Sequence, residues 1–183
     1  MLLDTPICDF GWKAPDFTLK DANGESFTMS EHLGEKGLLV MFICNHCPYV
    51  KRIAAQLAED TKALKAEGIN VLAVMSNDYR DYEADSPENM LKFATEHGFE
   101  FPYLVDEDQS VGKAYGAICT PDFFGFNAKG ELQYRGRLDD SRPNADSSER
   151  TPELLNAMRQ IAETGEGPKD QLPSMGCSIK WMS

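Results

Sequence analysis

Two cysteines separated by two residues are the strongest chemical feature of this sequence. Cys44 and Cys47 enclose Asn45 and His46, and Pro48 follows directly. Cysteine reacts as the thiolate, so a redox site needs a feature that favours anionic sulfur at neutral pH. A protonated His46 would lower the pKa of a neighbouring thiol. Because cysteines at this spacing on the first turn of a helix can close into a disulfide, the segment predicts a reversible dithiol–disulfide site.

The segments on either side of this pair predict how it is held. An unbroken apolar run over 38–43 follows Gly37, as in a strand covered on both faces of a parallel sheet. From 48 to 67 apolar residues recur at helical spacing, and Gly68 stands where a helix ends. The first N–H groups of a helix are unpaired and carry partial positive charge. We therefore expect both sulfurs at a helix start, where a thiolate is stabilised.

The remaining segments predict an α/β fold. A hairpin before the main sheet is expected over 14–29. After the strand and helix already described, the order is a strand (69–75), a helix capped by Ser86 (86–98), a strand (101–105) and a helix (109–115). A second hairpin (122–135), a polar loop (137–150) and a last helix (151–163) follow. This order predicts a central mixed β-sheet flanked by helices, with an inserted α-β-α unit.

Length and charge limit the organisation and the partners. A chain of 183 residues is expected to form one domain, over 1–168, and the Gly/Pro cluster 165–168 is expected to detach a C-terminal tail over 169–183. The formal charge of −12 disfavours binding to nucleic acid or to anionic membrane surfaces. The sequence has neither an export-signal pattern nor an apolar run of bilayer length, so we expect a cytoplasmic location.

Taken together, the strand, the C-x-x-C motif, the helix and Thr120-Pro121 before a hairpin resemble a thioredoxin fold. The opening 14–21 with Gly24, the α-β-α insertion and the segment 134–139 are similar to the alkyl hydroperoxide reductase/thiol-specific antioxidant (AhpC/TSA) branch, and the resemblance covers roughly 14–161. It implies a thioredoxin-like fold in which Pro121 is a cis-proline beside the active-site disulfide. It also implies that Cys44 is the more exposed, attacking sulfur and that Cys47 resolves the mixed disulfide.

The predicted site therefore consists of Cys44, His46, Cys47, Thr120 and Pro121, with no cofactor and no metal. The leading interpretation is a thiol–disulfide oxidoreductase that acts on protein or small-molecule disulfides and is served by an unidentified reductant. Its oligomeric state is left open.

Two alternatives remain at this stage. Pro48 suits the first helical position, which makes Cys47 the cap residue. Cys47 would then be the low-pKa, peroxidatic sulfur of a thiol peroxidase, with Cys44 resolving. Matching the peroxiredoxin pattern P-x-x-x-T/S-x-x-C onto Cys47 places Val40 and Cys44 where Pro and Thr or Ser belong, so we expect slow peroxide reduction. The second alternative is a Cu(I) or zinc carrier, because thiolates and imidazole suit these metals.

Other reactive residues are interpreted as structural. Cys119 is expected to be a buried small hydrophobe. For Cys177 an ordinary tail thiol is favoured over a mobile resolving cysteine, and Cys8 is assigned no function. Because 38–43 is wholly apolar, the acceptor for the proton of the second thiol is unassigned. A solvated charged loop is expected to contain four acids: Asp78, Asp81, Glu83 and Asp85.

Overall fold

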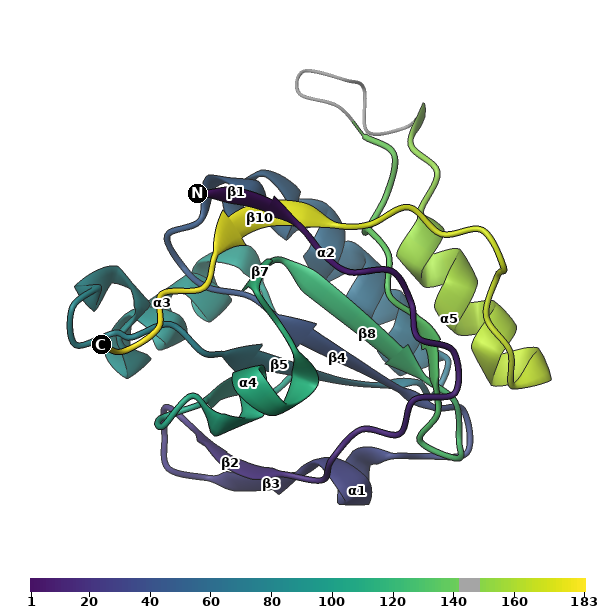
Figure 1. The fold of residues 1–183 in the computed structure, drawn as a ribbon, viewed down its shortest axis with the longest axis horizontal. Helices are drawn as coiled ribbons and strands as arrows, with labels where there is room; N and C mark the ends of the chain where they lie inside the picture. The colour runs from purple at the N-terminus through teal and green to yellow at the C-terminus, as the bar shows by residue number, and fades with distance from the viewer. Residues whose placement is uncertain (142–148) are drawn as a thin grey trace.

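The computed structural model describes residues 1–141 and 149–183, so part of the predicted polar loop 137–150 lies outside the described residues. Its centre is a seven-stranded sheet in the order β3-β2-β6-β5-β4-β8-β9 (Figure 1). The strands are β2 (Thr18–Asp21), β3 (Ser26–Thr28), β4 (Leu38–Phe42), β5 (Asn70–Met75), β6 (Tyr103–Val105), β8 (Asp122–Phe126) and β9 (Leu132–Tyr134).

The strand directions confirm the predicted mixed sheet. Strands β4, β5 and β6 run parallel to one another, and β8 lies antiparallel on the other side of β4. Hairpins close both edges, β2–β3 at one and β8–β9 at the other. All five residues of β4 are buried, as its unbroken apolar sequence predicts for a central strand.

Helices cover both faces of this sheet. The helices are α1 (Met29–His32), α2 (Pro48–Ala66), α3 (Pro87–His97), α4 (Ser110–Tyr115) and α5 (Glu153–Thr164), with a 3-10 turn η1 (Glu83–Asp85). Side chains of β4 alternate between two cores. Leu39 and Met41 face α2, α3 and α5, and Val40 and Phe42 face the side of α1 and α4. In the part of the chain described, no helix is long and apolar enough to cross a membrane.

Local signals in the sequence account for the helix boundaries. Ser86 caps α3 by accepting a hydrogen bond from the Asn89 backbone N–H, and Gly98 ends the helix in the left-handed conformation. Pro48 occupies the first turn of α2, and Cys47 is its N-cap residue. Strand β4 ends two residues before Cys44, so the cysteine pair spans the junction between β4 and α2.

The expectation of a detached tail is wrong. The segment 169–183 returns to the body as β10 (Met175–Ser178), which lies between β1 (Leu2–Asp4) and β7 (Cys119–Thr120) in a second, three-stranded sheet (Figure 1). Ile179, directly after β10, is buried in the core. The unpaired edge of β7 explains this docking, because β10 satisfies its backbone hydrogen-bonding groups.

Candidate active site

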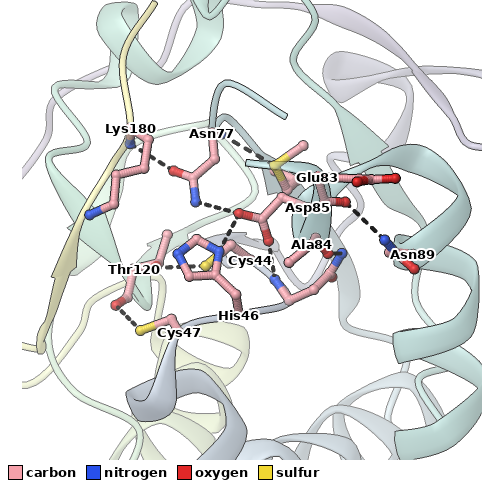
Figure 2. A network of polar contacts seen from close by, with 12 residues as sticks. Cys44, His46, Cys47, Asn77, Glu83, Ala84, Asp85, Asn89, Thr120 and Lys180 are labelled. Atoms are coloured by element: carbon pink, nitrogen blue, oxygen red, sulfur yellow. Dashed lines mark hydrogen bonds and ion pairs between the residues drawn. The ribbon is translucent and has the colours of Figure 1, made fainter. Parts of the chain in front are cut away.

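The predicted site residues meet at the junction of β4, α2 and β7. The Cys44 Sγ lies 3.4 Å from Thr120 Oγ1, and the Cys47 Sγ lies 3.4 Å from the Thr120 carbonyl oxygen (Figure 2). The Thr120–Pro121 peptide bond is cis, as the resemblance predicted. Both cysteines are free thiols, as is Cys119, which is buried as expected. The structure therefore brings the cysteine pair and the cis-proline together.

Exposure does not distinguish the two cysteines in the way that the resemblance implies. Both are buried, with exposed fractions of 1% for Cys44 and 0% for Cys47. Cys177 of β10, a strand that the sequence did not predict, packs against the core cluster that contains both thiols.

The two thiols differ in electrostatic environment. The pKa of Cys47 is lowered to about 4 by a hydrogen bond from the Cys44 thiol, and the backbone N–H groups of Val50 and Cys177 lower it further, against the opposing effect of burial. No capping hydrogen bond of regular geometry forms from the Cys47 side chain at the start of α2. The pKa of Cys44 is raised well above its ordinary value by its hydrogen bond to Cys47, by burial and by the negative charge of Asp85. This environment favours Cys47 as the thiolate.

His46 is paired with the carboxylate of Asp85. The sequence predicted instead that its charge acts on a neighbouring thiolate. The His46 Nδ1 lies 2.5 Å from Asp85 Oδ2, and its ring stacks on Tyr82 with 6.1 Å between the ring centroids. The hydrogen bond to Asp85 raises the pKa of His46. The predicted charge is therefore favoured, but its principal partner is the Asp85 carboxylate. The sequence did not predict this interaction with Asp85.

Asp85 is the most important residue of the site that sequence reasoning missed. It was assigned to a solvated loop, yet its exposed fraction is 0%. Its carboxylate accepts hydrogen bonds from the Asn45 backbone N–H at 2.7 Å and from Asn77 Nδ2 at 2.9 Å, in addition to His46. Burial raises the pKa of Asp85, but the hydrogen bonds from these three partners outweigh it and hold the pKa below its ordinary value.

The position of Asn77 was the available signal for this network. Asn77 follows β5, the parallel neighbour of β4, and parallel strands present their carboxyl ends at one edge of a sheet. This rule could have placed Asn77 near Cys44 from the sequence, but the residue was not singled out there. The network extends further in both directions. Tyr103 Oη donates to Asn45 Oδ1, and the Lys180 backbone N–H donates to Asn77 Oδ1 (Figure 2).

Three side chains of the site could contact a metal ion. Ligand atoms of Cys44, His46 and Asp85 lie within 4.8 Å of one another. The Asp85 oxygens already accept three hydrogen bonds, and a carboxylate is a hard ligand that suits Cu(I) poorly. The donor set fits an ordered polar network better than a soft-metal site.

The His46–Asp85 pair predicts a pH dependence of stability. Because the pKa of His46 is raised in the folded protein, the stabilisation is complete below the unfolded value of about 6.5 and is lost as the pH rises through the folded value. We expect His46→Asn to remove this dependence and to cost about 1 kcal/mol at low pH. Urea denaturation of the reduced protein at several pH values measures both.

His97→Asn is the matched control, because its ring packs on Phe93 and Phe99 at the end of α3. Parallel pH profiles for the wild type and His46→Asn would contradict the assignment.

A C-x-x-C pair at a strand–helix junction, set against a cis-proline in a mixed sheet, defines a thioredoxin-like fold. The AhpC/TSA family profile matches residues 10–135, and the chain belongs to that family.

Three relatives illustrate the range of this similarity. An uncharacterized conserved protein of Geobacillus kaustophilus has a solved structure with a TM-score of 0.92 and 40% identity, covering 100% of this chain and 97% of that one. The thiol-disulfide oxidoreductase ResA of Halalkalibacterium halodurans is 28% identical over 130 residues, 70% of this chain and 69% of that protein. Peroxiredoxin Bcp of Escherichia coli K12 is 28% identical over 112 residues, 61% of this chain and 67% of that protein.

Proposed function

We propose that this protein is a thiol–disulfide oxidoreductase in which Cys47 is the nucleophile and Cys44 the resolving thiol. The observation that carries the proposal is geometric: the two cysteines lie at the start of α2, each with its sulfur 3.4 Å from an atom of Thr120, beside the cis bond to Pro121. The surroundings lower the pKa of Cys47 and raise that of Cys44, and this difference supports Cys47 as the nucleophile. This order of roles reverses the one implied by the thioredoxin resemblance.

The reaction divides into two exchanges. The Cys47 thiolate attacks one sulfur of a substrate disulfide, forms a mixed disulfide and releases the first substrate thiolate. The Cys44 thiol then attacks the Cys47 Sγ, closes the Cys44–Cys47 disulfide and passes its proton to the departing second thiolate. One substrate disulfide becomes two thiols, and two protein thiols become one disulfide. The reverse sequence reduces the protein.

A cavity beside the cis-proline indicates a class of small substrate. It measures about 200 Å³ and is lined by Pro121, Tyr49, Arg52 and Arg137 among others. Arg137 is already paired with Glu153, whereas the Arg52 guanidinium lies over the Tyr49 ring, 5.8 Å from its centroid. Guanidinium groups bind carboxylates well. Small disulfides that carry carboxylates, such as oxidised glutathione, are therefore the substrates we would test first.

The proposed reaction predicts a defined product. Reduced protein treated with a small excess of oxidised glutathione is expected to form an intramolecular Cys44–Cys47 disulfide and to release two equivalents of reduced glutathione. Peptide mapping by mass spectrometry identifies the linked pair, and thiol quantification gives the stoichiometry. If Cys44 and Cys47 both stay reduced while glutathione couples elsewhere, the proposed function is incorrect.

Peroxide reduction is a second candidate activity, supported by the same lowered pKa of Cys47. A Cys47 sulfenic acid formed by peroxide would be resolved by Cys44 with release of water. Val40, which stands where the peroxiredoxin pattern has proline, faces the opposite core from the cysteine pair. Stopped-flow oxidation by hydrogen peroxide is therefore expected to be slower than disulfide exchange, and a faster peroxide reaction would reverse the ranking.

Cell fractionation tests the predicted cytoplasmic location.

A further inference from the structure

Strand β10 holds a third cysteine against the active-site pair. In the β10–β7 ladder, Cys177 is the register partner of Thr120, whose carbonyl oxygen contacts the Cys47 Sγ. Gly176 packs so closely against the Thr120 peptide group that a β-carbon at position 176 would overlap the Thr120 carbonyl oxygen. The Cys177 side chain packs against the core cluster that contains Cys44 and Cys47.

Exposure divides the three sulfurs into two groups. Cys44 and Cys47 have exposed fractions of 1% and 0%, whereas Cys177 is partly exposed. Disulfide exchange requires a nucleophile to reach a sulfur along the S–S axis, so access limits its rate. A protein dithiol outside the fold meets Cys177 before it meets either sulfur of the pair.

We propose that Cys177 is a third redox cysteine, which relays disulfide exchange between the buried Cys44–Cys47 pair and dithiols of other proteins, whereas small disulfides react with Cys47 directly. This inference rests on the proposed function, because it requires a Cys44–Cys47 disulfide. It assigns a reactive role to a residue that sequence reasoning treated as an ordinary tail thiol.

The relay is balanced at each exchange. The Cys177 thiolate attacks the Cys47 Sγ of the oxidised pair, forms a Cys47–Cys177 disulfide and releases Cys44 as a thiolate, which takes up a proton. A thiolate of an external dithiol then attacks the Cys177 Sγ and releases the Cys47 thiolate. The external partner's second thiol then attacks the partner's first sulfur, which is bonded to Cys177. This step frees the Cys177 thiolate and leaves the external partner as a disulfide. Two electrons move from the external dithiol to the protein.

The environment of Cys177 depends on the oxidation state of Cys47. In the reduced protein the pKa of Cys177 is raised to about 11 by burial, by its hydrogen bond to Cys47 and by the Cys47 charge, while Lys180 and the N-terminal amine lower it. When Cys47 enters a disulfide, its charge and its acceptor role disappear, so two of the three raising effects are removed. Cys177 thus becomes more nucleophilic when an oxidised pair is present to attack.

Removing Cys44 isolates the relay step. Cys44→Ser protein is treated with oxidised glutathione and mapped by mass spectrometry, with Cys44→Ala as a second variant should the hydroxyl disturb the buried position. We expect the mixed disulfide on Cys47 to be resolved by Cys177, giving a Cys47–Cys177 disulfide and free glutathione. A stable glutathione adduct on Cys47, with Cys177 still reduced, would overturn the relay. Failure of the proposed function is distinguishable, because wild-type protein would then form no Cys44–Cys47 disulfide.

Kinetics on the oxidised protein provide an independent test. Cys177→Ser is expected to slow reduction by a reduced thioredoxin at least about tenfold, because the accessible sulfur is lost. Cys8→Ser is the matched control, because Cys8 is also partly exposed and burial raises its pKa to about 11. Equal reduction rates for wild type, Cys177→Ser and Cys8→Ser would contradict the proposal.

Discussion

Replacing Cys47 by serine is expected to abolish disulfide exchange, with a loss of about a thousandfold or more in rate, because the residue supplies the thiolate for the first step. Cys44→Ser is expected to retain that first step and to lose only the closure of the Cys44–Cys47 disulfide. The consumption of oxidised glutathione in a single turnover separates the two variants. Cys119→Ala is the control, since burial raises the pKa of Cys119 to about 12 and leaves it protonated.

The same assignment predicts how reactivity responds to pH. With a Cys47 pKa of about 4, the thiolate is present throughout the neutral range, so the first step should change little with pH until the solution approaches that value. Thiolate ultraviolet absorbance of the reduced protein should fall on acidification toward about pH 4 and should be missing at neutral pH in Cys47→Ser. If Cys44→Ser instead removes the neutral-pH absorbance, the roles of the two cysteines are the reverse.

The largest expected effect on stability comes from Arg135→Met. Arg135 pairs with Asp122, the first residue of β8, through Nη2 and Oδ2 at 2.8 Å, with exposed side-chain fractions of 8% and 0%. Its guanidinium also lies over the Phe124 ring, 4.4 Å from the centroid. Removing one partner of a buried pair leaves an uncompensated charge, so we expect a loss of roughly 3–5 kcal/mol in the free energy of unfolding. Urea denaturation of the reduced protein measures it.

The sign of the pH effect adds a second readout for this pair. Burial raises the pKa of Asp122 from 3.8 to about 6, although Arg135 opposes the rise, so wild-type stability should fall as the pH increases through that interval. Without Arg135 the pKa rises further, and the fall should continue above pH 6. The double variant Asp122→Leu/Arg135→Met removes both charges and should recover most of the loss. A single variant as stable as wild type would show that the pair contributes little.

Much of the fold was predictable because its signals are local. The apolar run before Cys44, the helical spacing after Pro48, the Ser86 cap and the hairpin over 122–135 each depend on a few neighbouring residues. Strands β1 and β10 lack such signals. They are short, with the sequences Leu-Leu-Asp and Met-Gly-Cys-Ser, and they form only because each finds a distant edge. Pairing of this kind is decided by tertiary context and not by strand propensity.

The features of the site also divide into those with a local sequence signal and those that depend on tertiary contacts. The C-x-x-C spacing and the Thr120-Pro121 dipeptide located its centre, since both are recognisable in the sequence itself. Asp85 was missed because a charged loop and a buried carboxylate have the same sequence pattern. Three hydrogen-bond donors make the difference: Asn45 and His46 between β4 and α2, and Asn77 after β5. The burial of the cysteine pair was missed for a related reason, because its core cluster also packs against Cys177 of β10, a strand far away in the sequence.

The position of β10 in the sequence has a consequence for biosynthesis. A ribosome completes β4, α2 and the cysteine pair long before it reaches β10, so the central sheet can begin to form before Cys177 packs against the core cluster that contains both thiols. During this interval the nascent chain exposes sulfurs that the finished protein buries. Oxidants therefore meet a different cysteine chemistry on the nascent chain than in the folded protein.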